Sequence, residues 1–356
     1  MKERSERMNK TYFHRLHEQT PTRMWINNVT RKQAVQAIEA GATGCTQNPA
    51  YTWKMMQDPE ERPYVMSLLD TILRDEPDDN TALIKLQREL VRGVAELFMP
   101  IYEKSQGVDG YVSIQGDPFN EKTSAILEYA RYNTAPLPNM TAKIPVVEEA
   151  LPAIRNLIRE GVPINCTEIM AVSQALDVGR IYAEVSKEVK TSSPVFYSVI
   201  TGIYDEYLHG YVKDNKIDIS EDVLWQAGMA VAKKTYALIQ QNQYKCRFIG
   251  GGARGLQHFT EMVGANAIVT INWKGTADKL LELNYPVVER FFMPVPYSVE
   301  DELLEKVDDF RRAYMINGLK PEEYEGFGPV VLFRSSFETA WNNALNEVGR
   351  RRLEMG

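Results

Sequence analysis

The stretch NMTAKIPVVEEALPAI, residues 139–154, predicts a short apolar strand followed at once by a helix. Leu151, Ile154 and Ile158 recur at helical spacing and mark one apolar stripe. A strand followed directly by such a helix is typical of parallel α/β sheets. The strand also carries Lys143, an ammonium group where a solvated surface charge is not expected. The stretch therefore predicts one unit of an α/β fold and raises the question of what this lysine does.

Seven more short apolar runs are each followed by a segment with helical periodicity. The eight predicted strands lie at 23–27, 43–46, 110–115, 140–145, 162–168, 194–199, 246–251 and 267–271. Eight alternating units predict a closed (β/α)8 TIM barrel. A doubly wound open sheet usually has a glycine-rich turn after its first strand, and none is present there. The later run GGGARG at 250–255 comes too late in the chain to serve as a dinucleotide fingerprint, and it predicts a loop of close backbone approach.

Two helical segments exceed a minimal barrel. Residues 52–105 predict an insertion of about three helices, and residues 276–356 predict a helical C-terminal tail. Neither is joined by a linker rich in Pro, Gly or Ser, so we expect one domain over 1–356 with its barrel at about 23–275. The long tail could cover a subunit interface, which leaves a homo-oligomer open.

Composition narrows the class of protein. The chain has 356 residues, 44% of them hydrophobic, which suffices for a sizeable core. A net charge of −7, without a basic run interleaved with aromatics, argues against a nucleic-acid partner. The charged N-terminus lacks the apolar core of a signal peptide, and no apolar run approaches the ~20 residues that span a bilayer. We therefore expect a cytoplasmic protein with no membrane partner.

Cysteines and histidines predict no cofactor and no metal site. Cys45, Cys166 and Cys246 are far apart and odd in number, which predicts buried thiols rather than a disulfide framework. The four histidines show no zinc-binding spacing. His14 and His17 could share a helix face, but two surface histidines are the better interpretation.

Polar residues gather where the predicted strands end, and the carboxyl ends of barrel strands face the active site. They are Asn27, Asn28, Thr46, Gln47, Asn48, Gln115, Lys143, Asn165, Thr167, Ser198 and Arg254. A lysine buried without a partner loses its proton more easily, and the free amine can attack a carbonyl to form a Schiff base. From the residues alone, two alternatives stay open: a lysine paired with a carboxylate, or one pointing outward between strand and helix.

Five segments in one order resemble the transaldolase family, a class of Schiff-base-forming (β/α)8 barrels that includes fructose 6-phosphate aldolases. They are GCTQNPA at 44–50, TAKIPVVEEALPAI at 141–154, GVPINCTEIMAVSQA at 161–175, SVITG at 198–202 and GGARG at 251–255. The resemblance runs from about residue 23 to about residue 285. It implies carbohydrate metabolism in the pentose phosphate pathway, with a small-molecule sugar or sugar phosphate as the partner.

The resemblance also implies roles for single residues. Lys143 would form the Schiff base with the ketone of a sugar donor, and Thr167 would position the water that shuttles protons. Gln115 and Asn27 complete the catalytic set, because they match the family's catalytic positions on strands three and one. The substrate-binding set would be Asn48, Asn165 and Ser198 for hydroxyls, with Arg254 for a phosphate or other anion.

The proton-transfer groups depart from the family. Asn27 stands where transaldolases have an aspartate, and Gln115 stands where they have a glutamate, so the usual acid/base pair is absent as carboxylates. Gln115 resembles the aldolase branch, but Ile200 occupies the place of that branch's tyrosine. Four residues near strand ends could supply the missing base: Asp117, Glu168, Tyr197 and Tyr204. Strand alternation turns Glu168 and Tyr197 away from the pocket unless the strand has already ended.

The residues expected to bind a substrate phosphate also depart from the family pattern, because Ile203 rather than an arginine follows Gly202. Three functions therefore stay open. The first is a transaldolase that moves a dihydroxyacetone unit between sugars or sugar phosphates. The second is an aldolase that releases or uses free dihydroxyacetone, and the third is a sugar-binding paralogue without turnover.

Overall fold

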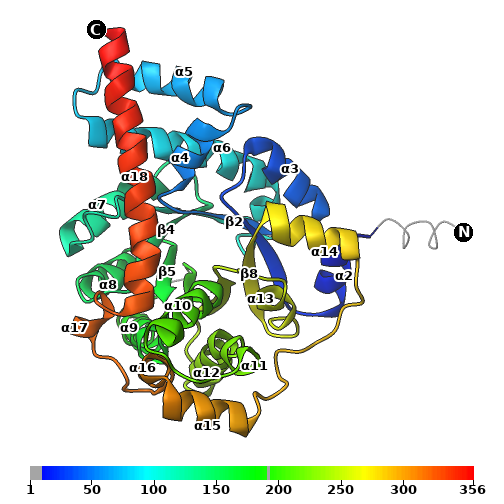
Figure 1. The fold of residues 1–356 in the computed structure, drawn as a ribbon. Coiled ribbons are helices and arrows are strands. Elements are labelled where there is room, and N and C mark those ends of the chain that lie inside the picture. The colour runs from blue at the N-terminus through cyan, green and yellow to red at the C-terminus, as the bar shows by residue number, and fades with distance from the viewer. Residues whose placement is uncertain (1–9, 191–192) are drawn as a thin grey trace, which may run out of the picture.

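The computed structural model describes residues 10–190 and 193–356, and it closes eight parallel strands into a barrel (Figure 1). Their bounds are β1 (Arg23–Asn27), β2 (Gly44–Gln47), β3 (Val112–Gln115), β4 (Met140–Pro145), β5 (Ile164–Ile169), β6 (Val195–Ile200), β7 (Arg247–Gly251) and β8 (Ala267–Asn272). Strand β1 pairs with both β2 and β8, which closes the ring. The predicted (β/α)8 barrel is therefore confirmed, and each predicted run overlaps one strand.

Helices surround this barrel and lie on its outside (Figure 1). The helices before residue 200 are α2 (Tyr12–Gln19), α3 (Arg31–Ala40), α4 (Tyr51–Gln57), α5 (Arg62–Leu73), α6 (Asp79–Lys104), α7 (Thr123–Thr134), α8 (Ala150–Glu160) and α9 (Val172–Glu188). Those after it are α10 (Thr201–Asp214), α11 (Glu221–Leu224), α12 (Ala227–Gln241), α13 (Gln257–Thr260), η1 (Trp273–Ala277), α14 (Asp278–Leu283), α15 (Tyr297–Lys306), α16 (Asp308–Tyr314), α17 (Pro321–Tyr324) and α18 (Gly328–Met355). The segment between β2 and β3 contains α4, α5 and α6, in agreement with the three helices expected there.

The opening stretch illustrates how sequence sets these elements. Strand β4 is buried throughout, and helix α8 follows it with Ile154, Leu157 and Ile158 buried on one face. Gly161 ends α8 in the left-handed conformation, with φ 76°, where a residue without Cβ carries no steric cost. Local signals thus agree with the packed fold.

Bulky side chains fill the barrel interior below the polar strand ends. Trp25, Tyr111, Phe196, Ile249 and Ile268 form one buried cluster, in which the rings of Trp25 and Phe196 have centroids 5.3 Å apart. Such layers make a TIM barrel a packed core rather than a pore. The polar residues at the carboxyl ends of the strands therefore rest on an apolar floor.

Helix α18 is the longest element of the tail and runs from the top of Figure 1 across the barrel, drawn in red to orange. It packs against α4, α5, α6 and α10 and also contacts β5. The tail thus covers part of the chain's own barrel. A homo-oligomer stays a prediction.

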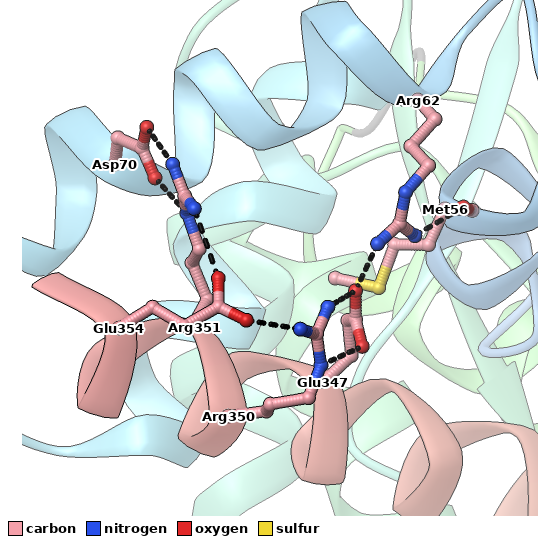
Figure 2. Close-up of polar contacts among 7 residues, drawn as sticks. All are labelled: Met56, Arg62, Asp70, Glu347, Arg350, Arg351 and Glu354. Atoms are coloured by element: carbon pink, nitrogen blue, oxygen red, sulfur yellow. Dashed lines mark hydrogen bonds and ion pairs between the residues drawn. The ribbon is translucent and has the colours of Figure 1, made fainter.

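Ion pairs fasten the C-terminal half of α18 to α5, as Figure 2 shows. The Arg351 guanidinium donates two hydrogen bonds of 2.7 Å to the two carboxylate oxygens of Asp70. Arg62 donates to Glu347 at 2.5 Å, and Arg350 pairs with the same carboxylate. These groups are partly exposed, so each pair contributes little free energy, but the bidentate geometry fixes where the helix lies.

The cysteines and the two N-terminal histidines differ in their burial. Cys45, Cys166 and Cys246 are buried and free, as expected. His14 and His17 are half-buried rather than fully on the surface, and His17 accepts a hydrogen bond from the backbone of Met24. In the described part of the chain, no helix has the length and apolarity needed to cross a membrane.

Candidate active site at the carboxyl end of the barrel

A cavity of about 270 Å³ lies at the carboxyl ends of the strands. The predicted site residues that line it are Asn27, Asn48, Lys143, Thr167, Ser198 and Arg254. Helix α18 adds Phe333, Ser336 and Phe337. Two further predicted residues, Gln115 and Asn165, touch this set from beneath through hydrogen bonds to Lys143 and Ser198. The fold thus brings all eight predicted residues to one end of the barrel.

Lys143 is buried near the end of β4, and 6% of its surface is exposed. Its Nζ donates a hydrogen bond of 3.0 Å to Oε1 of Gln115. It also lies 5.3 Å from the ring centroid of Phe337 and 5.8 Å from that of Phe333. Burial lowers the pKa of Lys143 to about 8, an effect that the negative charge of Glu168 opposes. A useful fraction of free amine is therefore present near neutral pH.

Glu168 points toward the site, which corrects the expectation from strand alternation. Its φ of 59° is left-handed, and the register between β5 and β6 shifts between Cys166 and Ile169. Such an irregularity re-aims a side chain. Its Oε1 accepts a hydrogen bond of 2.9 Å from Nε2 of Gln115. Hydrogen bonds therefore join Glu168 to Lys143 through Gln115.

The other three candidate bases have different surroundings. Asp117 accepts from the Asn80 side chain at 2.9 Å. Tyr197 packs on Phe248, in the layer between sheet and helices, as predicted. The Tyr204 hydroxyl donates to the backbone oxygen of Asp309 at 3.2 Å. Of the four candidates, all among the described residues, Glu168 alone is hydrogen-bonded to the pair of Gln115 and Lys143.

Amide and hydroxyl groups line the rest of the cavity. The Asn27 amide donates to Oδ1 of Asn272 at 3.1 Å. The Asn28 amide donates to Oδ1 of Asn48 at 2.9 Å. Fixed neutral dipoles of this kind suit the hydroxyl groups of a sugar.

A second pair completes this polar lining. The Ser198 hydroxyl donates to Oδ1 of Asn165 at 2.7 Å. The Thr167 hydroxyl is buried without a hydrogen-bond partner among the described residues. Since buried polar groups are usually paired, the Thr167 hydroxyl has bonding capacity to offer a ligand or a water.

Arg254 lies at the rim of the cavity and is about half exposed. Its Nε donates to Oε2 of Glu206 at 2.5 Å. A carboxylate thus already occupies one edge of the guanidinium that was predicted to bind phosphate. Close backbone approach shapes the loop before it, because a Cβ on Gly202 would lie 2.2 Å from the carbonyl oxygen of Gly252. Ile203, which stands where an arginine was expected, is buried.

A buried histidine supports the Arg254 loop. Nδ1 of His258 accepts from the backbone N–H groups of Arg254 and Gly255, at 3.3 and 3.2 Å. Its Nε2 therefore carries the proton and donates to Oδ2 of Asp205 at 2.8 Å. Burial raises the pKa of Asp205, and the bond from His258 opposes the rise. Sequence spacing gave no signal for this pair.

We expect His258→Phe to lower the free energy of unfolding by about 1.5–3 kcal/mol, because it removes the side-chain donor to the buried Asp205 carboxylate, which keeps only the backbone N–H of Gly228. Urea denaturation measures this. His258→Gln is the control, since its amide can donate to Asp205 and accept from the loop, and it should recover about half of the loss or more. Equal losses in both variants would contradict the pairing role.

Helix α18 supplies the residues that sequence reasoning missed. Phe333 and Phe337 are one helical turn apart, a spacing that predicts a buried stripe but does not say what the stripe contacts. The part of the chain that the structure describes has no group of three His, Cys, Asp or Glu residues able to hold a metal ion. The cavity is lined by a lysine, an arginine, neutral polar groups and an aromatic cover.

Comparison with known proteins places these features in a family. The family described as Transaldolase/Fructose-6-phosphate aldolase matches residues 24–314. A transaldolase of Trichodesmium erythraeum is 30% identical over 175 residues, which cover 45% of this chain and 44% of that protein. A transaldolase of Thiobacillus denitrificans is 24% identical over 251 residues, or 65% of this chain and 68% of that protein. A transaldolase of Kocuria rhizophila is 30% identical over 174 residues, covering 45% of each. The chain thus spans about half the length of several curated relatives it matches.

Proposed function

This chain belongs to the transaldolase/fructose-6-phosphate aldolase family, and we propose that it transfers a dihydroxyacetone unit between sugar phosphates through a Schiff base on Lys143. One observation carries the proposal. A lysine with its pKa lowered to about 8 lies at the end of β4, against a 270 Å³ cavity lined by amides and hydroxyls. Imine formation needs a desolvated amine that faces a cavity able to admit a carbonyl substrate. The relatives, as far as they match, are named transaldolases.

The chemistry would begin at the free amine of Lys143. Its nitrogen forms a bond to the ketone carbon of the donor sugar, and the carbonyl oxygen takes up a proton. Loss of water from this carbinolamine leaves a protonated imine. The Thr167 hydroxyl, buried and unpartnered among the described residues, would hold that water.

Cleavage then follows from the imine. A base removes the proton of the hydroxyl on the far carbon of the bond to be broken, the carbon–carbon bond breaks, and that carbon leaves as the aldehyde group of an aldose. The electron pair moves toward the imine nitrogen and gives an enamine. In transfer, the enamine carbon attacks the aldehyde of an acceptor and the steps run in reverse. Asn48 and Ser198, both on the cavity wall, would hold the hydroxyls of the retained unit.

Arg254 would bind the phosphate of the substrate, provided that the phosphate displaces Glu206. Charge-assisted bidentate bonds favour the phosphate over a single partly exposed ion pair. A neutral sugar would leave the Arg254–Glu206 pair intact. We favour the phosphorylated substrate because Arg254 lines the same cavity as Lys143.

An aldolase is the second candidate. Gln115, bonded directly to Lys143, favours it by resemblance to that branch. Ile200 opposes it, because an apolar side chain lies where that branch has a tyrosine, and the residue lines the same cavity. In this candidate the enamine carbon takes up a proton, and water then releases free dihydroxyacetone. From its family we also propose that the protein acts in the cytoplasm, in the pentose phosphate pathway.

Trapping of the imine tests the proposal. Incubation with fructose 6-phosphate and then borohydride should leave a reduced adduct on Lys143, located by peptide mass spectrometry. Adding an aldose phosphate acceptor should discharge the bound unit to a new ketose before reduction. Free dihydroxyacetone formed at an acceptor-independent rate would favour the aldolase. If no ketose or ketose phosphate gave an adduct on Lys143, the transaldolase and the aldolase would both be excluded, and the sugar-binding paralogue would be favoured.

A further inference from the structure

We propose that Glu168 is the positioning residue of this site, whose carboxylate fixes the Gln115 amide so that the amide oxygen faces the Lys143 amine. The inference rests on the proposed Schiff-base role of Lys143. It assigns a task to a buried acid that the mechanism above does not use. Three observations carry it: the chain of hydrogen bonds, the backbone turn that aims Glu168 inward, and the charges around the acid.

The hydrogen-bond chain allows one orientation of Gln115. Oε1 of Glu168 accepts from Nε2 of Gln115 at 2.9 Å, and Oε1 of Gln115 accepts from Nζ of Lys143 at 3.0 Å. All three side chains are more than nine-tenths buried. An ionised carboxylate can only accept, so Gln115 must turn its NH₂ group toward Glu168. Its oxygen is thereby left for Lys143.

This orientation suits a nucleophile. With the Gln115 oxygen facing it, the neutral amine of Lys143 donates an N–H and keeps its lone pair for the substrate. A reversed amide would offer an N–H to that lone pair and block attack. A protonated Glu168 could donate to the Gln115 oxygen and would permit the reversed orientation. The ionised form of Glu168 therefore keeps the lone pair of the free amine unblocked by the Gln115 amide.

The backbone at Glu168 is adapted to this task. Its φ of 59° is unusual for a residue with a side chain, and it coincides with the irregular register of β5 against β6. Regular alternation would have turned the side chain toward the helices, because Thr167 already lines the cavity. The local turn places the side chains of Thr167 and Glu168 on the same side of the strand.

Charged groups from several elements face Glu168. Lys143 lies on β4, Glu121 lies between β3 and α7, and Arg334 and Glu338 project from α18. Arg334 Nε lies 3.3 Å from Glu121 Oε2, and Arg334 Nη1 lies 2.8 Å from Oε1 of Glu325. Both cationic groups favour an ionised acid at this position. Helix α18 thus contributes charge as well as aromatic cover.

The two buried acids, Glu121 and Glu168, have different partners. Burial and the neighbouring Glu168 charge raise the pKa of Glu121 to about 9, an effect that Arg334 opposes. Burial also raises the pKa of Glu168, while Gln115, Lys143 and Arg334 oppose the rise. Oε1 of Glu168 accepts from Gln115, whereas Oε2 of Glu121 lies 3.3 Å from Nε of Arg334. The Gln115 bond and the two nearby cations stabilise the ionised form of Glu168.

The test measures the pH dependence of Lys143 labelling by cyanate, a small reagent for free amines, with peptide mass spectrometry and no sugar present. Glu168→Gln should shift the labelling midpoint to lower pH, because it removes the negative charge that stabilises the ammonium form. Glu121→Gln is the matched control. Because Glu121 lies against Arg334 and is not among the groups that shift the pKa of Lys143, this variant should leave the midpoint where it is in the wild type.

Activity supplies a second readout. Glu168→Leu should lower kcat by about tenfold or more with KM nearly unchanged, because Gln115 loses its orienting partner. Glu168→Gln should recover part of that loss, since its amide can still accept from Gln115. An unchanged labelling midpoint in Glu168→Gln, or an equal shift in Glu121→Gln, would overturn the inference. A shifted midpoint in a protein that forms no sugar adduct would instead sink the proposed function and support the placement of Glu168.

Discussion

Lys143→Met is expected to abolish the borohydride adduct and to reduce kcat by about 10⁴-fold or more, the range seen when a covalent nucleophile is removed. Methionine has nearly the length of lysine and fills the same buried space without an amine. Sugar binding by Asn48 and Ser198 should survive, so ligand affinity should change little. Mass spectrometry after reduction and a coupled transfer assay measure the two losses.

The same variant gives a stability test with a defined sign. The folded protein lowers the pKa of Lys143 to about 8 from the ordinary 10.5, so the unfolded chain binds more protons between these values. The stability of the wild type relative to Lys143→Met should therefore rise with pH across this window, by about 3 kcal/mol at roughly 1.4 kcal/mol per pH unit. Lys143→Met lacks this group and should lack the rise.

Urea denaturation of both proteins between pH 7.5 and 10.5 measures the difference. Lys32→Met is the control, because Lys32 on α3 is an exposed lysine with a surface partner. Its stability should follow the wild type through the same pH range. A parallel pH dependence in Lys143→Met and wild type would contradict a lowered pKa at Lys143.

The fold and most of the site could be predicted because their signals are local. Each strand is a short apolar run, and β4 with α8 forms one continuous pattern. Residues that end parallel strands meet at one edge, so Asn48, Lys143 and Ser198 come together once the barrel is known. The position of Lys143 in an apolar strand raised the Schiff-base hypothesis, and the resemblance to the transaldolase family favoured it.

The direction of the Glu168 side chain escaped prediction because it depends on a backbone irregularity. Alternation is a rule for regular strands, and the left-handed φ of 59° breaks it at a residue with no sequence mark of a turn. The aromatic cover escaped for a different reason. The spacing of Phe333 and Phe337 predicts one buried face of α18, but only tertiary packing decides that the face meets Lys143. Local sequence patterns do not determine which distant segments come into contact.

Phe337→Ala is expected to raise the pKa of Lys143 toward the ordinary lysine value, because water would replace the ring that lies 5.3 Å from Nζ. With a pKa of about 8, roughly a tenth of the amine is free at pH 7. Each unit of increase would lower that fraction about tenfold. The rate of imine trapping at pH 7 should fall accordingly and should recover when the pH is raised.

This loss must be separated from general destabilisation, since removing a buried phenylalanine costs about 3–5 kcal/mol. Phe310→Ala is the matched control, because Phe310 is a buried ring on α16 that stacks on Tyr314. Both variants should lose stability in urea, but only Phe337→Ala should move the pH midpoint of trapping upward. If the two variants kept the wild-type midpoint, α18 would be a structural cover with no part in tuning the lysine.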